Sequence, residues 1–194
     1  RSRNYLVKQK KTFVKHGLNF YLLPNYSEQE KASYSLRDSL ERADRIKALV
    51  KTIIDRNGKP VFLVGFSRGS VDVGRFAKTY PESVAGIVLA SGVYTNNSKK
   101  ARNFSMENVI GTQIATATLI AHHRKDTCRV TLFEYAEHFY NSLSAPAKNL
   151  LKYSGGRSSG RECGPLNHHG FEGIEVPVAT EISKWIREHT TLAK

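Results

Sequence analysis

The chain of 194 residues has little of several residue types, and these shortages narrow what it can be. It contains two cysteines, one methionine and one tryptophan. No apolar run approaches the roughly 20 residues that span a bilayer, and the basic start lacks the adjacent apolar core of a signal peptide. Internal repeats are absent as well. With 40% hydrophobic residues, the chain instead suits one domain over residues 1–194 with a sizeable core.

Acidic residues are also scarce: the chain has 17 acidic and 30 basic residues, which gives a formal net charge of +13. Such a charge permits attraction to nucleic acid, to anionic membranes or to acidic substrates. The basic residues are scattered along the chain, however, and no nucleic-acid-binding module can be recognised. We therefore expect no specific nucleic-acid partner, while weak binding to an anionic surface stays open.

The apolar residues recur in two patterns, one typical of helices and one typical of buried strands. Helices are expected over residues 1–16, 36–56, 71–80, 133–143 and 174–187, and strands over 18–23, 61–64, 84–90, 117–121 and 149–153. The connection over residues 94–116 is too short for a large lid domain. This alternation favours a layered α/β fold with a mostly parallel sheet.

A serine lies where one of these strands passes into a helix, within Gly65-Phe-Ser67-Arg-Gly69. A sharp turn between a strand and a helix pushes such a hydroxyl into solvent. Gly65 and Gly69 are expected to keep side chains away from the crowded corner. The bare pattern arises by chance about once in fifteen chains of this length. A structural turn with an idle serine therefore remains the alternative.

A serine nucleophile requires a base, usually a histidine, and a carboxylate that orients the base. Asp126 follows the strand predicted over residues 117–121, and two histidines, His168 and His169, precede the last helix. Three suitable residue types thus stand at predicted strand ends, in the order serine, aspartate, histidine. His122 and His123, which close the strand before Asp126, are expected to pack against the acid loop or to orient it.

This order and the turn at Ser67 resemble the α/β-hydrolase superfamily, over essentially the whole chain. The segments His122-His-Arg-Lys-Asp-Thr-Cys128 and Cys163-Gly-Pro-Leu-Asn-His-His-Gly-Phe-Glu-Gly-Ile-Glu175 resemble the acid and histidine loops of small bacterial hydrolases. The resemblance implies a three-layer α/β-hydrolase-like fold and an esterase-like activity on a small-molecule or acyl-ester substrate, with no cofactor.

In that resemblance, Ser67 attacks a carbonyl carbon, His169 takes the serine proton and Asp126 orients the imidazole. His168 is the competing base, and the Gly-Phe pair after His169 favours the latter. The backbone N–H of Arg68 is the expected first donor to the oxyanion, and the preceding Phe66 is expected to border the substrate pocket.

Relative to the family, the first strands and the loop with the second oxyanion donor would lie before Arg1. We therefore expect an upstream segment, either cleaved but still associated or not included in this sequence, to complete the sheet and the oxyanion hole. A form that does without these first strands is the alternative, and a contact with another copy of the chain stays open. A sheet without its edge strand would expose unpaired backbone and apolar surface.

The two cysteines stand close in sequence to the residues that the resemblance assigns to the site. Cys128 follows Asp126 by two residues and Cys163 precedes His169 by six, so a folded triad would bring their loops together. We predict a disulfide that closes a loop of about 36 residues and stabilises the fold by roughly 3 to 4 kcal/mol. Such a bond favours a periplasmic or secreted protein; two free thiols and a cytoplasmic protein are the alternative.

Other functions remain open at this stage. The chain could be a non-catalytic binding protein on a hydrolase scaffold that uses its basic surface. Serine chemistry could also serve transfer, thioester cleavage or amide cleavage. A metal site is not expected, because adjacent histidines rarely point the same way in extended chain and no spaced motif such as H-E-x-x-H is present.

Overall fold

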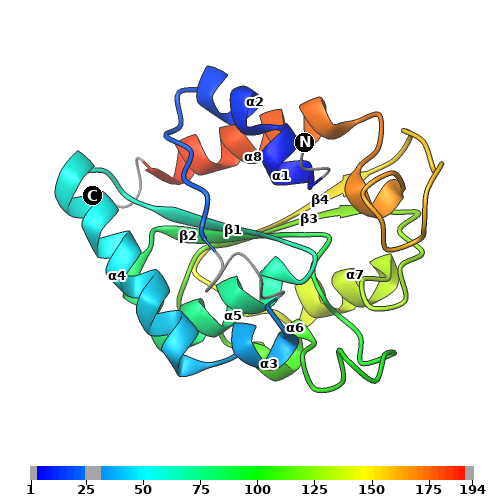
Figure 1. The fold of residues 1–194 in the computed structure, drawn as a ribbon, viewed down its shortest axis with the longest axis horizontal. Helices are drawn as coiled ribbons and strands as arrows, with labels where there is room; N and C mark the ends of the chain where they lie inside the picture. The colour runs from blue at the N-terminus through cyan, green and yellow to red at the C-terminus, as the bar shows by residue number, and fades with distance from the viewer. Residues whose placement is uncertain (1–3, 25–31, 191–194) are drawn as a thin grey trace.

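The computed structural model describes residues 4–24 and 32–190. Four parallel strands form one sheet in the order β1-β2-β3-β4 (Figure 1). They are β1 (Phe62–Phe66), β2 (Gly86–Ala90), β3 (Thr118–His123) and β4 (Lys148–Tyr153). Each strand pairs with the one before it in the chain, and a helix lies in each connection. All four carboxyl ends therefore meet at one edge of the sheet.

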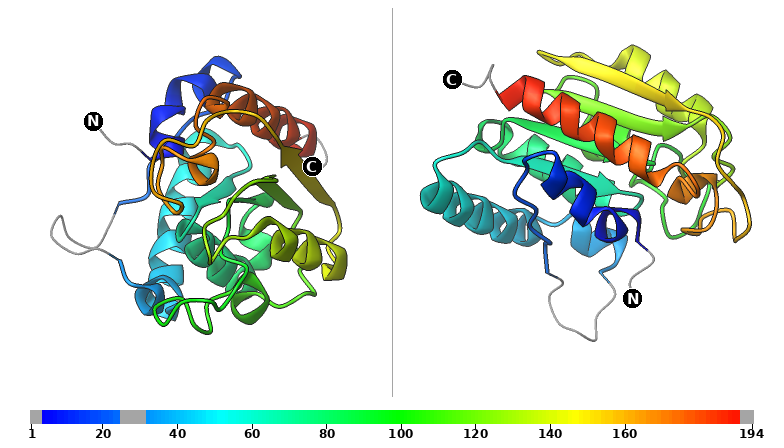
Figure 2. Two further views of the ribbon diagram at one scale, coloured as in Figure 1. Left: turned by 90° about the vertical axis from the view of Figure 1, so that its right-hand side faces the viewer. Right: turned by 90° about the horizontal axis from the view of Figure 1, so that it is seen from above.

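Helices cover both faces of this sheet, which gives three layers (Figures 1 and 2). One face carries α3 (Tyr34–Arg37), α4 (Leu40–Asn57), α5 (Gly69–Thr79), α6 (Met106–Val109) and α7 (Phe133–Ser142). The other face carries α1 (Tyr5–Lys8), α2 (Lys10–Lys15) and α8 (Glu175–Thr190). Two short 3-10 helices, η1 (Pro81–Ser83) and η2 (His168–Gly170), complete the described elements. None of the described helices is both long and apolar enough to cross a membrane.

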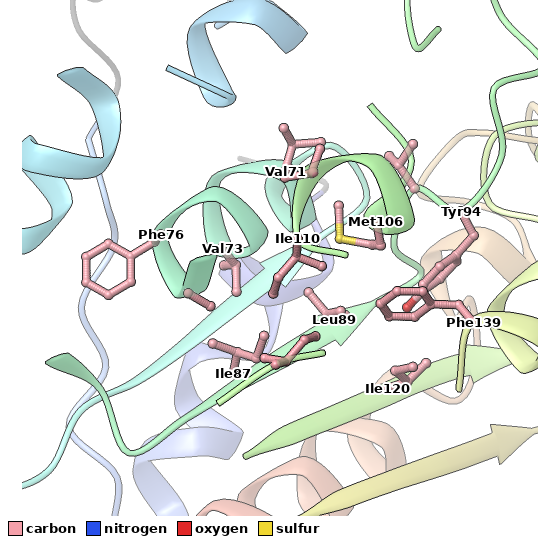
Figure 3. Packing of buried hydrophobic residues seen from close by; sticks show 14 of the residues in the cluster. Val71, Val73, Phe76, Ile87, Leu89, Tyr94, Met106, Ile110, Ile120 and Phe139 are labelled. Carbon is pink, nitrogen blue, oxygen red and sulfur yellow. The ribbon is translucent and has the colours of Figure 1, made fainter. Parts of the chain in front are cut away.

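The core has two halves, one on each side of the sheet. Side chains of a strand alternate between faces, so Ile87 and Leu89 join one hydrophobic cluster and Val88 joins the other. Figure 3 shows the first cluster, in which Ile87 and Leu89 lie beneath α5 and α6. Every residue of β2 and β3 is buried. Burial on both faces explains why β2 and the middle of β3, residues 119–121, are continuous apolar runs.

The expected order of elements is largely confirmed. The strands predicted over residues 61–64, 84–90, 117–121 and 149–153 and the helices predicted over 71–80, 133–143 and 174–187 are present with shifted ends. The helix predicted over 36–56 is divided into α3 and α4, because the Ser39 side chain accepts a hydrogen bond from the Arg42 N–H and begins a new helix. The helix predicted over 1–16 is likewise divided into α1 and α2, and its first three residues lie outside the described part.

The strand predicted over residues 18–23 is wrong. Leu18 and Phe20 pack against the cluster under α8, whereas Leu23 packs against the cluster under α5. The segment therefore passes from one face of the sheet to the other (Figure 1). Residues 19–23 form no backbone-to-backbone hydrogen bond with other described residues, so they are not part of the sheet. β1 is consequently an edge strand of the described sheet, and its pairing with an upstream segment or another copy remains a prediction.

Candidate active site

Ser67 occupies the tight turn between β1 and α5, with a backbone φ of 53°. This left-handed conformation is uncommon for a residue with a side chain. A methyl group at Gly65 would lie 2.5 Å from the Gly69 carbonyl oxygen, so only glycine fits there. The expectation for Gly69 is wrong, because a methyl group at that position would meet nothing within 4 Å. The turn therefore requires one of its two glycines for space.

His169 lies in η2, at the end of the long loop that follows β4, and it is 1% exposed. The side chain of Asn167 accepts a hydrogen bond from the His168 N–H at 2.7 Å and donates one to the Gly160 carbonyl at 3.1 Å. The Ser91 hydroxyl, at the end of β2, donates to the carbonyl of His169 at 2.9 Å. The histidine backbone is thus held both from within its own loop and from a neighbouring strand end.

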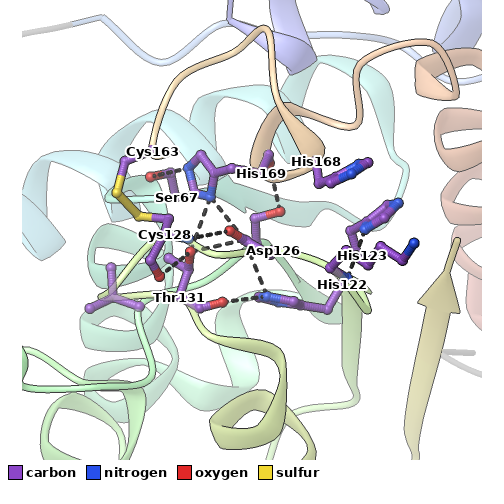
Figure 4. A network of polar contacts seen from close by, with 12 residues as sticks. Ser67, His122, His123, Asp126, Cys128, Thr131, Cys163, His168 and His169 are labelled. Carbon is purple, nitrogen blue, oxygen red and sulfur yellow. Dashed lines mark hydrogen bonds and ion pairs between the residues drawn. A yellow bond between two sulfur atoms is a disulfide. The ribbon is translucent and has the colours of Figure 1, made fainter. Parts of the chain in front are cut away.

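The structure brings Ser67, His169 and Asp126 together (Figure 4). His169 Nε2 lies 3.0 Å from Ser67 Oγ, and His169 Nδ1 lies 3.0 Å from Asp126 Oδ2. A neutral imidazole whose Nδ1–H donates to the carboxylate leaves Nε2 free to accept the serine proton. His168 instead stacks on His123, with ring centres 4.3 Å apart, and forms no hydrogen bond to Ser67.

Asp126 is almost fully buried, and several donors surround its carboxylate. Oδ1 accepts the backbone N–H of Cys128 at 2.9 Å, and Oδ2 accepts the Thr131 hydroxyl at 2.9 Å. His122 Nε2 lies 3.3 Å from the same Oδ2. Burial alone would raise the pKa of this carboxyl, but hydrogen bonds from His122 and His169 outweigh it and hold the pKa well below its usual value. The group is therefore ionised at neutral pH.

Thr131 is a site residue that the sequence did not single out. Its hydroxyl lies 3.1 Å from His169 Nδ1 as well as 2.9 Å from Asp126 Oδ2, so it contacts both partners of the histidine–carboxylate pair. Its backbone carbonyl accepts a hydrogen bond from His122 Nε2 at 2.5 Å. His122 thus contacts the acid loop at two points, as expected of a residue that orients it. The only sequence signal for Thr131 is its position five residues after the acid.

The disulfide between Cys128 and Cys163 is present, as predicted. The Cα atoms of the two cysteines lie 4.6 Å apart, and the bond joins positions separated by 35 residues. It links the loop of Asp126 directly to the loop of His169 (Figure 4).

The residues on either side of Ser67 have distinct surroundings. The backbone N–H of Arg68 donates to no backbone carbonyl of a described residue, which leaves it available to a ligand at the start of α5. The ring of Phe66 lies 5.2 Å from the ring of His169 and 5.8 Å from that of Tyr5. Phe66 therefore packs beside the imidazole of His169.

Two surface cavities lie away from Ser67 and His169, and the described residues form no cluster of potential metal ligands. A surface cavity of about 340 Å³ is lined by Leu23, Pro24 and residues of α4, and another of about 220 Å³ lies beside the end of α5. Neither lining includes Ser67 or His169, so we associate neither with the site. Within residues 4–24 and 32–190, no group of three histidine, cysteine, aspartate or glutamate residues is arranged to hold a metal ion.

Solved structures of other proteins share this arrangement of helices and strands. The esterase Pf2001 of Pyrococcus furiosus is 13% identical, with 95% of this chain and 76% of that chain covered and a TM-score of 0.66. A structure described with LipS and LipT, two metagenome-derived lipolytic enzymes, is 16% identical, with coverages of 97% and 89% and a TM-score of 0.65. A monoacylglycerol lipase of Paleococcus ferrophilus is 16% identical, with 76% of each chain covered and a TM-score of 0.53.

No family model matches the chain, and no curated protein matches it either. At these low identities, the structural likeness shows the fold alone. The expected fold class is confirmed: the protein has an α/β-hydrolase-like fold, with a parallel four-stranded sheet between two layers of helices.

Proposed function

We propose that this protein is a serine hydrolase that cleaves an acyl ester through a covalent intermediate on Ser67. The observation that supports this most directly is the continuous contact from Ser67 Oγ to His169 Nε2 and from His169 Nδ1 to Asp126, with 3.0 Å at each step. A serine hydroxyl is a weak nucleophile without such a base.

In this mechanism, Ser67 Oγ attacks the ester carbonyl carbon while its proton moves to His169 Nε2. The backbone N–H of Arg68 donates to the oxygen on which negative charge develops. The alcohol then leaves with the proton from His169, and the acyl group stays on Ser67. A water molecule, deprotonated by His169, attacks the acyl carbon and releases the acid and the free serine.

Asp126 stabilises the charged imidazole during both steps without taking its proton. Its low pKa keeps it ionised at neutral pH. The Thr131 hydroxyl fixes the position of the carboxylate oxygen that faces the ring. Phe66 packs against the other side of the imidazole and would border the acyl group.

An ester is the preferred substrate because structures of similar fold are described as an esterase and a monoacylglycerol lipase. The same residues could cleave a thioester or an amide or transfer the acyl group, and substrate tests separate these outcomes. The Cys128–Cys163 disulfide supports a further part of the proposal, a periplasmic or secreted location, because such bonds persist in oxidising compartments.

A fluorophosphonate probe tests the nucleophile directly. We expect a covalent adduct on the Ser67 peptide in the folded protein, no adduct in Ser67→Ala, and labelling slowed by about 10³-fold or more in His169→Asn. Hydrolysis of 4-nitrophenyl butyrate should be lost in the same two variants.

An unlabelled Ser67 in the folded protein, with ester hydrolysis unchanged in Ser67→Ala, would refute the proposal. If Ser67→Ala then bound heparin or anionic vesicles as the unmodified protein does, with a strong dependence on salt, a binding protein on a hydrolase scaffold would be the better explanation.

A further inference from the structure

Positive charge is concentrated at the edge of the sheet where Ser67 lies. We call the four connections that follow β1 to β4 the carboxyl-end loops: residues 67–68, 91–105, 124–132 and 154–174. They hold nine basic and three acidic residues, an excess of six positive charges. The basic residues are Arg68, Lys99, Lys100, Arg102, Arg124, Lys125, Arg129, Arg157 and Arg161.

The opposite edge of the sheet carries no such excess. The segments that lead into the four strands, residues 58–61, 80–85, 110–117 and 143–147, contain one basic residue, Lys59, and one acidic residue, Glu82. The net charge of +13 is therefore distributed unevenly, with almost half of it on loops at the edge of the sheet where the proposed nucleophile lies. The sequence does not reveal this concentration of charge, because the basic residues are scattered along it. The parallel strands bring loops that are distant in the sequence to one edge of the sheet.

Few ion pairs neutralise these charges within the loops, although the first turns of α6 and α7 add Glu107 and Glu134 at the same edge and Arg124 interacts with Glu137 of α7. All nine basic residues of the carboxyl-end loops are exposed. Arg157 Nη2 lies 3.6 Å from Glu172 Oε1, and the Arg124 guanidinium lies 5.6 Å from the ring centre of Phe133. The other seven form no salt bridge with a residue that the structure describes. Of the three acidic residues, Asp126 is buried and already engaged in the site.

Three of the arginines belong to well-fixed parts of the site. Arg68 follows Ser67 directly, Arg129 follows Cys128, and Arg161 precedes Cys163 by two residues. The disulfide joins the last two loops, and the Arg129 carbonyl accepts the hydroxyl of Thr95 at 2.6 Å. These cations therefore do not sit on free tails, and their field acts on any molecule that approaches Ser67.

The same loops offer little to a membrane. Proteins that insert into a lipid surface present large apolar side chains beside their cations. The exposed large hydrophobic residues of the described chain are Val14, Tyr21, Leu22, Leu40, Leu49, Ile54, Tyr135 and Val176. None of them lies in the carboxyl-end loops, and only Tyr135 and Val176 lie in the helices that follow these loops. A dissolved anion fits this surface better than a bilayer.

We propose that the substrate is a water-soluble ester that itself carries negative charge, as a carboxylate or a phosphate. This substrate class rests on the proposed hydrolase function. The cations of the carboxyl-end loops attract the anionic group and raise the rate at which the ester reaches Ser67. Clefts with charge of one sign increase association by about 10-fold to 1,000-fold at low salt.

Two matched pairs of esters test the proposal with the full chain. The first pair is the 4-nitrophenyl monoester of adipic acid and 4-nitrophenyl hexanoate, which differ by a carboxylate on the acyl chain. The second is phenyl butyrate with and without a carboxylate on the ring. We expect kcat/KM for the anionic ester to exceed that of its neutral partner by about 10-fold or more in at least one pair at low salt. The preference should shrink as salt shortens the screening length to about 3 Å at 1 M.

A double variant, Arg129→Gln with Arg161→Gln, tests the origin of the preference. Two unit charges about 10 Å from the anion account for about a fourfold change in water, so the ratio of anionic to neutral kcat/KM should fall about fourfold. The matched control is Arg56→Gln with Lys59→Gln, which removes the same charge at the opposite edge of the sheet. It should leave both the ratio and the neutral-ester rate unchanged.

The outcomes separate this inference from the function on which it rests. If both neutral esters are cleaved in a Ser67-dependent way and neither anionic ester is preferred, the substrate class is wrong and the hydrolase stands. An equal fall of the ratio in the two double variants would also overturn it, as would activity that appears only on anionic vesicles. Failure to cleave any ester, with Ser67 unlabelled by fluorophosphonate, would instead remove the hydrolase itself.

Discussion

The two glycines on either side of Ser67 differ in the space around them, and alanine at each position tests the geometry of the turn. A methyl group at Gly65 would lie 2.5 Å from the Gly69 oxygen and 2.8 Å from the Ser70 Cα. Carbon atoms pack at about 3.5 to 4.0 Å, and these neighbours are backbone atoms that cannot rotate away. Gly65→Ala should therefore lower the free energy of unfolding by about 1 to 3 kcal/mol or more.

Gly69→Ala is the matched control. Its methyl group meets nothing within 4 Å, and Gly69 begins α5 with an ordinary φ. Alanine in a helix is better than glycine by up to about 1 kcal/mol. The free energies of unfolding of the two variants should thus differ by about 1 to 4 kcal/mol, with Gly69→Ala equal to or above the unmodified protein.

Urea unfolding measures this difference, with the single tryptophan as the probe. Trp185 is 5% exposed, and its ring lies 5.9 Å from that of Phe62 in β1, so its fluorescence should report loss of the sheet. The slopes with urea must agree before free energies are compared. If Gly65→Ala unfolds within about 0.5 kcal/mol of the unmodified protein, the close approach of β1 and α5 is not as described.

Three further changes test the loops around His169. Replacing Cys128 and Cys163 by alanine should reduce the free energy of unfolding by about 4 kcal/mol, from a 35-residue separation in the chain-entropy model; a loss below about 1 kcal/mol in urea unfolding would contradict this. Thr131→Val removes a hydrogen bond to a carboxylate, worth about 1.5 to 3 kcal/mol, so kcat for ester hydrolysis should fall about 10-fold to 150-fold, whereas Thr131→Ser should retain most activity. The folded-state pKa of Asp126 lies below the unfolded value of about 3.9, so its ionised form stabilises the fold above that pH, and the stabilisation is lost as pH falls through the folded pKa. The unfolding free energies of the unmodified protein and Asp126→Asn, measured at several pH values, should therefore converge on acidification, and a constant gap would count against the pKa shift.

The sequence predicts the fold best where one physical requirement acts alone. β2 is buried on both faces, so its apolar run is unambiguous. Residues 18–23 form a similar apolar run, yet Leu18 and Leu23 serve opposite faces of the sheet. Composition cannot distinguish a strand from a segment that crosses a sheet edge. The sequence also predicts one continuous helix across Ser39, because the apolar spacing continues there. In the structure, the capping hydrogen bond from the Arg42 N–H to Ser39 divides this helix in two.

The residues of the candidate site also divide into those that the sequence predicts and those that only the folded loops reveal. Ser67, Asp126 and His169 could be nominated because parallel strands bring their following residues to one edge. Thr131 could not, because its contact depends on how the loop after Asp126 folds back, and a loop threonine is unremarkable in sequence. The space at Gly69 was equally hidden, since a motif states where glycine occurs and not whether a methyl group would fit.

Backbone strain in the described chain gathers around the histidine. Four residues other than glycine have a positive φ: Ser67 at 53°, Ser91 at 42°, Asn103 at 72° and Phe171 at 57°. Asparagine tolerates this conformation, but each of the other three costs of the order of 1 kcal/mol. Glycine would relieve each of them and would delete a side chain that the site uses. The Ser67 hydroxyl contacts His169, the Ser91 hydroxyl holds its carbonyl, and the buried ring of Phe171 anchors the chain two residues after it. At each of these three strained positions, the side chain therefore helps to hold the imidazole of His169 in place. Backbone strain is expected at such positions if that imidazole performs the chemistry.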